Sequence, residues 1–232
     1  MQYKTLLQLR TKIENDLDLQ DELFITASQL NDIINEAIDD AEAEIHNTYQ
    51  DYFLKVGNIA LVSGTATYSL PSDIYMNKIR HISYTNGAIK YEIKRMREMH
   101  GFMDQLYADQ YPSTADEYMY RLINQGASTG VQIRLFPPAQ ETSSTNVEIW
   151  YLRNAATLSA DTDVCDIPEF YTYIVQNAKC RCYEKEPGHP NYPAALQERE
   201  RLKQLMISTL ETMIPDNDNK IEIDYSHYEE HS

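Results

Sequence analysis

The clearest pattern in the chain is a run of apolar residues spaced three and four apart between Ala27 and Tyr49. This spacing places them on one face of a helix, and Thr26 followed by Gln29 is a capping box that marks the start of the helix. Acidic residues occupy the remaining positions and are predicted to fill the outer face: Asp32, Glu36, Asp39, Asp40, Glu42 and Glu44. The pattern predicts a long amphipathic helix with an acidic surface.

A second helical pattern begins at Asp166, which is predicted to form a capping box with Glu169 while Pro168 occupies the first turn. One broad stripe is apolar: Ile167, Phe170, Tyr171, Ile174, Val175, Ala178 and Cys182. The opposite face is polar: Thr172, Gln176 and Lys179. Because so wide a stripe needs several neighbours to cover it, we expect this to be the central core helix.

Two more amphipathic patterns predict helices on either side of these. The first covers about residues 3–15, with the apolar side Leu6, Leu7, Leu9, Ile13 and Leu17. The second runs from Tyr192 to about Ile214, with the predicted buried side Ala195, Leu202, Leu205, Met206, Leu210 and Met213.

From Gly57 the apolar period changes from 3.6 to 2, which predicts strands instead of helices. The predicted strands are 58–64, 65–74, 76–87, 88–95, 117–124, 130–138 and 146–154. The pair Asn86–Gly87 is typical of a two-residue hairpin turn, and a second hairpin is predicted across 125–130. A Met-rich stretch at 95–107 predicts a short helix. The sequence therefore predicts an α+β fold, namely a mainly helical bundle with an inserted antiparallel β module and an extended C-terminal tail.

These patterns also predict the domain limits. Residues 1–56 and 161–214 would form the helical bundle, 57–160 the inserted β module, and 215–232 a flexible acidic arm. The arm is too polar to build a core, yet Ile221, Ile223 and Tyr225 alternate with Glu222 and Asp224 as in a strand. Either the arm is simply solvated, or its segment Lys220–Tyr225 adds to the edge of a partner's sheet.

The formal net charge of −16 makes ordinary binding to a phosphate backbone improbable. It is uneven, because Met1–Leu54 holds twelve acidic and three basic residues. Two readings remain open: the charge keeps the protein soluble, or it forms a surface that lies beside a polyanion without gripping it.

Motifs for catalysis or cofactor binding do not stand out in the sequence. It contains no Gly-rich phosphate loop, HExxH or GxSxG motif. Cys180 and Cys182 point in nearly opposite directions on a helix, so they cannot share a metal ion. No apolar run approaches the ~18–20 residues that a membrane span needs. We therefore expect no enzyme, no cofactor, no metal and no membrane insertion.

The order of the parts resembles a known family. A helix pair with an acidic face precedes TATYSLPSDIYMNKIRHISY, a hairpin with IRLFPP, VEIWYLRNA, LSADTD, the DIPEF helix start and a closing helix. This succession, over most of Leu30–Met213, is similar to the head-to-tail adaptor proteins of tailed bacteriophages, of the portal-bound ring type of short-tailed phages.

The resemblance implies a structural virion protein that is assembled in the host cytoplasm. It implies a homo-oligomer, usually a dodecameric ring, that binds the portal protein and the next tail or ring component. DNA would pass through the ring without specific binding. On this basis the acidic residues of the long helix are predicted to face the channel, and Lys220–Tyr225 to bind the portal or a neighbouring subunit.

Two readings from other classes stay open. The β module could bind a ligand such as a carbohydrate, with Trp150 and the tyrosines as stacking platforms. Alternatively, the many carboxylates could include an acid–base pair of an enzyme, which would require converging Asp or Glu residues in a deep pocket.

Overall fold

The computed structural model of the protein describes residues 3–18, 25–96, 118–124, 126, 130–186 and 188–214. The chain divides into two units. Met1–Tyr49 and Thr157–Ser232 form the first, called here the helical unit, and Gln50–Ala156 form the second, called the β unit. The limits predicted from the sequence for the inserted module, 57–160, differ from these by a few residues at each end.

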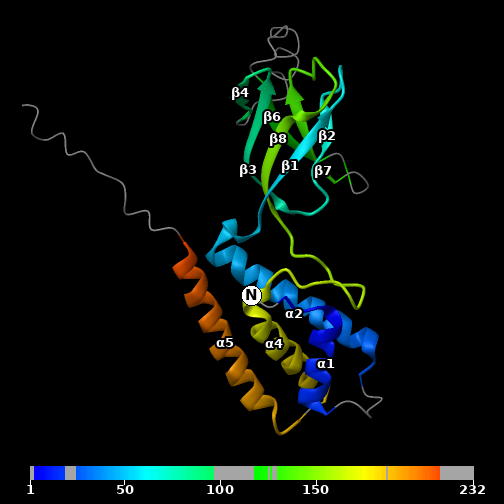
Figure 1. Ribbon diagram of the computed structural model, residues 1–232, viewed down its shortest axis with the longest axis vertical. Coiled ribbons are helices and arrows are strands. Elements are labelled where there is room, and N and C mark those ends of the chain that lie inside the picture. Colours follow the sequence, from blue (N-terminus) through cyan, green and yellow to red (C-terminus); the bar gives the residue numbers. More distant parts are fainter. Residues whose placement is uncertain are drawn as a thin grey trace, which may run out of the picture. The chain divides into compact units, whose positions relative to one another are not determined.

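The helical unit is built around α4 (Tyr171–Glu184), which packs against α1 (Leu6–Leu17), α2 (Ala27–Thr48) and α5 (Tyr192–Met213) (Figure 1). Its predicted role as the central core helix is confirmed. Because helices cover it on several sides, the polar side chains of Gln176 and Asn177 are buried as well. Gln176, predicted to be exposed, instead donates a hydrogen bond from Nε2 to the carbonyl oxygen of Ala195 at 2.9 Å.

The starts of the helices follow local hydrogen bonding. At α2 the predicted capping box is confirmed, because the Thr26 hydroxyl accepts from the N–H of Gln29 while the Gln29 side chain accepts from the N–H of Thr26. The capping box predicted at Asp166 is wrong. Ile167 occupies that N-cap position, before the 3-10 turn η2 (Pro168–Phe170), and no side chain caps it. The chain enters the helix through this tighter 3-10 turn, so the α-helix itself starts only at Tyr171.

The segment before η2 is tied to the helices by side chains. The side-chain amide of Asn35 in α2 pairs with both backbone polar groups of Leu158. Its Nδ2 donates to the Leu158 carbonyl at 2.9 Å, and its Oδ1 accepts from the Leu158 N–H at 2.8 Å. Arg10 of α1 pairs with Asp161 at 2.9 Å. These contacts join residues more than a hundred positions apart into one helical body.

The β unit begins with a 3-10 turn, η1 (Gln50–Phe53). Its strands are β1 (Leu54–Leu61), β2 (Thr67–Ser69), β3 (Ile74–Asn86), β4 (Ile89–Glu92), β5 (Lys94–Arg95), β6 (Met119–Asn124), β7 (Val131–Phe136) and β8 (Ser143–Arg153). They form one sheet in the order β1-β8-β3-β4 and a second in the order β2-β7-β6-β5. Both predicted hairpins, β3–β4 and β6–β7, are confirmed. The described pairs are antiparallel except for β5 with β6.

The two sheets bury one shared hydrophobic core. Sheet one contributes Ile59, Ile82, Val147 and Ile149, and sheet two contributes Ile133 and Leu135. Tyrosines fill much of the remaining space, and their hydroxyls reach the ends of the sandwich. The hydroxyl of Tyr84 donates to Glu141 at 2.9 Å and that of Tyr68 donates to the Thr65 carbonyl at 2.8 Å. A buried tyrosine is tolerated because its polar end finds a partner.

The predicted fold class needs correction. The protein is not a mainly helical bundle, although the α+β description broadly fits. The described chain has four α-helices in one unit and two four-stranded sheets in the other. The prediction was wrong because it treated the strands as an attachment to the helices, whereas two sheets that face each other bury a core of their own. The predicted helix at 95–107 lies almost wholly outside the described residues; of its residues only Arg95, which ends β5, and Met96 are described, and neither is helical.

Candidate interaction surfaces

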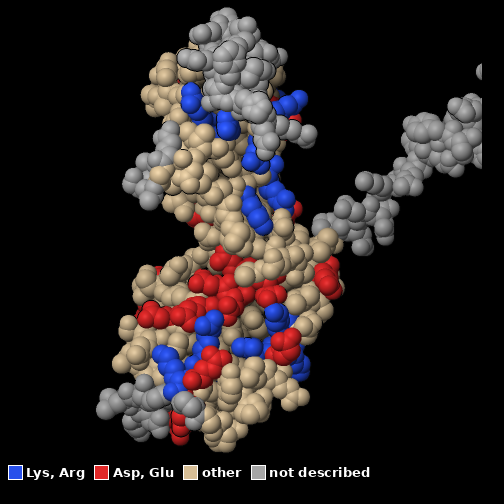
Figure 2. Space-filling view, turned by 180° about the vertical axis from the view of Figure 1, so that it is seen from behind, with Lys and Arg blue, Asp and Glu red and all other residues tan. Residues whose placement is uncertain are grey.

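The acidic face of α2 is the most highly charged surface of the helical unit. Figure 2 shows a band of Asp and Glu side chains across this unit, bordered by Lys and Arg. On α2 itself Asp32, Glu36 and Asp39 are exposed, and Asp40 and Glu44 are half-buried. Five of the six predicted acidic residues therefore reach the surface.

Basic residues of the neighbouring helices neutralise part of this face. Arg181 of α4 bridges Glu36 and Asp40, with its second guanidinium nitrogen 2.7 Å from Asp40. The hydrogen bond to Asp40, followed by the nearby carboxylates, raises the pKa of Arg181. Lys203 of α5 lies 2.6 Å from Glu44. These ion pairs join α2 to α4 and to α5.

Asp39 has no such cation in the part of the chain that the structure describes. Partial burial, then repulsion by Glu42, Asp40 and Glu36, raises its pKa above the ordinary value, although Arg181 lowers it somewhat. Burial is the larger cause, and the like charges of the neighbouring carboxylates add to it. Asp32 and Asp39 are therefore the two exposed carboxylates of α2 that no ion pair neutralises among the described residues.

Glu42 does not belong to the acidic face. It is buried, and its Oε1 lies 3.4 Å from Nε2 of the buried His46 one turn later. The spacing explains this: Ile38, Glu42 and His46 follow one another at four-residue intervals along the buried stripe. The sequence prediction assigned Glu42 to the outer face because of its charge, although its spacing already placed it inside.

A shallow groove of about 350 Å³ runs between α2 and α4. Its lining is mostly polar: Gln29, Asp32, Ile33, Glu36, Arg181, Glu184 and Lys185. Charges of both signs line it. Such a surface suits a polar protein contact better than an apolar ligand.

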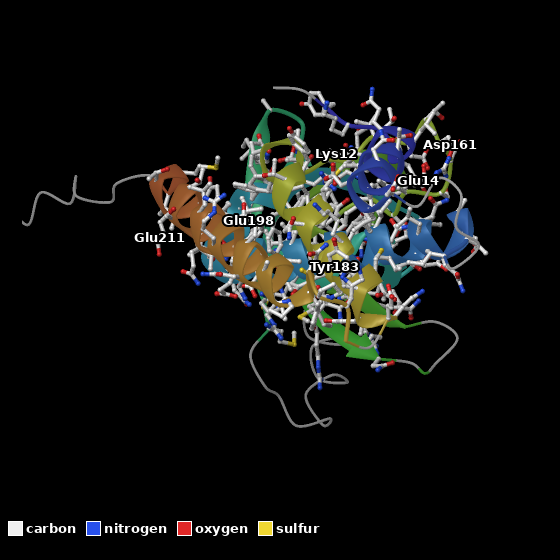
Figure 3. All side chains as sticks on the ribbon, turned by 90° about the horizontal axis from the view of Figure 1, so that it is seen from below. Lys12, Glu14, Asp161, Tyr183, Glu198 and Glu211 are labelled. Atoms are coloured by element: carbon white, nitrogen blue, oxygen red, sulfur yellow. The ribbon has the colours of Figure 1, made fainter. Side chains whose placement is uncertain are left out.

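The outer surface of the helical unit includes α1 and α5 (Figure 3). Glu198 and Glu211 lie on α5, and Asp161 lies beside α1, where it meets Arg10. Glu198 is held by Arg201 one turn later at 2.7 Å. Leu205, predicted to be buried, is 54% exposed, because only the stripe that includes Met206 and Leu210 faces the bundle.

In the β unit, a groove of about 500 Å³ lies beside β1. It is lined by Lys55, Gly57, Asn58, Ile59, Ala60, Tyr68, Ser69, Leu70, Pro71 and Tyr151. The lining comes from β1, from β2 with the residues that follow it, and from β8. Nothing in the sequence pattern signalled this groove, because β1 and β2 belong to different sheets.

A polar cluster closes one end of this groove. Lys55 pairs with Asp73 at 2.7 Å, and the Tyr151 hydroxyl donates to the other oxygen of Asp73 at 2.8 Å. Burial alone would raise the pKa of Asp73, but the hydrogen bonds from Lys55 and Tyr151 outweigh it and lower the pKa. The carboxylate is therefore ionised and fully engaged in holding the β2–β3 connection against β1 and β8.

Among the described residues, Trp150 and five tyrosines of the β unit do not form one exposed aromatic surface that could serve as a platform for a carbohydrate. Trp150 is 36% exposed and lies between Val56 and His81 of the neighbouring strands. The tyrosines that would extend such a platform are buried in the core instead: Tyr68, Tyr84, Tyr118, Tyr120 and Tyr151. A sugar-binding face needs several exposed rings, so this arrangement does not support that alternative.

Residues suited to chemistry are few in the described parts of the chain. No group of three or more metal-ligating side chains occurs among the described residues. The three cysteines are buried, and burial raises the pKa of Cys165 and Cys182 to about 11, so these two thiols keep their protons at neutral pH. In the described ranges, no helix is both long and apolar enough to cross a bilayer.

The predicted partner-binding residues lie outside the described residues. They are Lys220, Ile221, Glu222, Ile223, Asp224 and Tyr225.

Comparison with known proteins identifies the family. A family model described as "SU10 adaptor protein" matches residues 4–219, which include both units. No curated protein matches the chain. The match confirms the resemblance to phage head-to-tail adaptors that the order of sequence motifs indicated. The chain therefore belongs to the SU10 adaptor protein family, and it is a structural adaptor of the phage virion that contacts other head and tail components.

Proposed function

We propose that this protein forms a ring of twelve copies beneath the portal, where it joins the phage head to the tail. The ring surrounds the DNA exit channel, is assembled in the host cytoplasm, and carries the next tail or ring component on its other side. The observation that carries this proposal is the family match over residues 4–219.

The distribution of charge supports a channel role. Residues 50–156 contain ten acidic and ten basic side chains, so the entire net charge of −16 belongs to the rest of the chain. An acidic wall repels the DNA backbone, and such a wall lets DNA slide without being held. A ring that must release a genome gains from this repulsion.

The residues proposed to face the channel are the exposed and half-buried acids of α2: Asp32, Glu36, Asp39, Asp40 and Glu44. Glu42 is excluded because it is buried. Among them Asp32 and Asp39 contribute most per residue, since Arg181 and Lys203 partly neutralise Glu36, Asp40 and Glu44. The C-terminal segment Lys220–Tyr225 is proposed to bind a sheet edge in the portal or in a neighbouring subunit.

The ring itself is tested by native mass spectrometry of the protein alone and with its portal. We expect closed oligomers that bind the portal. A protein that remains monomeric in the presence of its portal contradicts the proposal.

The channel assignment is tested by charge reversal at one residue. Asp39→Lys should make the ring retard duplex DNA in a salt-sensitive manner and slow DNA ejection from assembled particles. Glu211→Lys on α5 is the matched control, because it makes the same charge change at another exposed helical position. Equal DNA retention by both variants would show that α2 does not face the DNA.

A further inference from the structure

The first strand of the β unit has one side without a partner in the described structure. β1 pairs with β8 along nearly its whole length, from Leu54 opposite Leu152 to Leu61 opposite Ser143. It is the outermost strand of its sheet. On the other side of it lies the groove lined by β1, β2 and Tyr151. A long edge strand of this kind is a template for another strand.

The groove is suited to a strand with apolar side chains on one face. Leu70 and Pro71 are partly exposed and supply apolar contacts along it, while Ile59, Tyr68 and Tyr151 are buried side chains of its lining. Lys55 is the one charged residue that lines the groove. Gly57 presents no side chain to an incoming strand. Backbone hydrogen bonds to β1 would supply affinity, and the apolar lining would select side chains at alternate positions.

The other free edge of the same sheet is less suitable. β4 has only four residues, Ile89–Glu92. It carries Lys90, which pairs with Glu148 at 2.6 Å. Short, charged edges are those that proteins keep from pairing. β1, with eight residues, is therefore the candidate receptor for an added strand.

The chain itself contains a segment with the matching pattern. Between Lys220 and Tyr225 every second residue is apolar: Ile221, Ile223 and Tyr225. At about 3.3 Å per residue these six residues span roughly 20 Å, which is shorter than β1. The six residues from Ile214 to Asn219 connect this segment to the end of α5.

Charge favours the β unit as the partner of this segment. Residues 215–232 carry six acidic side chains and one basic side chain. The rest of the helical unit has twenty acidic and nine basic side chains, so it repels the arm. The β unit has equal numbers of both, and the charged residues seen on its visible face are mainly Lys and Arg (Figure 2). The least repulsive surface on a second copy is therefore the β unit.

From the free edge of β1, the apolar groove beside it and the alternating C-terminal segment, we propose that Lys220–Tyr225 of one copy adds as a strand to β1 of a neighbouring copy. Ile221, Ile223 and Tyr225 enter the groove. This exchange of arms links adjacent subunits and gives the ring an interface that each isolated chain lacks. It rests on the proposed ring and names one of the two partners considered for the arm.

The binding site is tested with a protein truncated after Ile214 and a fluorescent peptide of residues 215–232, by anisotropy. We expect saturable binding. Ile223→Pro in the peptide should weaken it at least about tenfold, because proline removes a ladder donor. His227→Pro, outside the strand segment, is the matched control and should leave binding unchanged.

A substitution pair in the protein locates the receptor. Ala60→Glu places a negative charge on the exposed side of β1 in the groove and should also weaken binding at least about tenfold. Ile89→Glu makes a comparable change at the exposed edge strand β4 and should have no effect. Circular dichroism checks that both variants fold. Equal affinities of the two variants, or binding of a scrambled peptide, overturn the proposal.

Exchange between copies is tested by disulfide trapping. A chain truncated after Ile214 with Ala60→Cys is mixed with a full-length chain of different mass that carries Ile221→Cys. The native cysteines are buried and do not interfere. A cross-link between the two chains is expected, and its absence overturns the exchange. These measurements need no portal, so a failure here leaves portal binding by the ring intact, and a failure of portal binding leaves this result intact.

Discussion

The helical unit and the β unit satisfy their polar groups in different ways. In the helical unit, charged pairs join separate helices: Lys179 with Asp16 at 3.3 Å, Arg181 with Asp40, and Lys203 with Glu44. In the β unit, buried tyrosines place their hydroxyls on carboxylates and carbonyls at the ends of the sandwich. The first arrangement leaves many charges at the surface, although Glu42, His46, Gln176 and Asn177 are buried in this unit, whereas the second pairs the polar ends of core tyrosines.

This difference indicates which surface of each unit is not needed to hold its fold together. The interhelical ion pairs are partly exposed, and such pairs add little to stability, so the apolar stripes must hold the helices together. The acidic surface is then available for function. In the β unit the hydroxyls of the core tyrosines are taken up by hydrogen bonds within the unit, and the edge of β1 is the feature proposed for interaction.

The largest expected effect separates the two cores. Ile174 of α4 and Ile149 of β8 are both fully buried. Truncation of either to alanine should lower the free energy of unfolding by about 2–5 kcal/mol. Because Trp150 lies in the β unit, its fluorescence should report the loss for Ile149→Ala, while helical circular dichroism should report it for Ile174→Ala. A single transition that shifts equally for both variants would show that the units unfold together.

An intermediate effect concerns the tyrosine anchors. Tyr151→Phe removes the donor to Asp73 and should cost about 1 kcal/mol at neutral pH. The pKa of Asp73 is lowered in the folded protein, so the stability it contributes is present above its ordinary value of 3.8 and is lost as the pH falls through the lowered folded value. The difference between wild type and variant should therefore shrink in acid. Urea titrations at several pH values measure it, and a pH-independent difference would contradict it.

The smallest effect should have the opposite sign. The pKa of Asp39 is raised in the folded protein, so the stability linked to its protonated form is present below 3.8 and is lost as the pH rises through the folded value. Asp39→Asn should therefore stabilise the protein slightly at pH 7, by less than about 0.5 kcal/mol after solvent screening, and have no effect at pH 3. Glu198→Gln is the control, because the hydrogen bond from Arg201 lowers the pKa of Glu198. Stabilisation by both changes would point to net charge alone.

Local patterns determined much of the fold. The capping box at Thr26, the core role of α4 and both hairpins could be predicted because each depends on residues within a few positions of one another. The order of motifs was also enough to indicate the adaptor family. The acidic face of α2 followed from spacing, with the exception of Glu42, whose burial the same spacing indicated.

The tertiary structure decided what depends on distant partners. Gln176 is buried because α5 covers it, and Arg181 neutralises α2 because α4 passes beside that helix. β8 inserts between β1 and β3, which leaves β1 at the edge and opens the groove. A sequence specifies which residues are apolar and how they are spaced, but which segments meet depends on how the whole chain packs. Neither the balance of helix and sheet nor the free edge could therefore be predicted from local pattern.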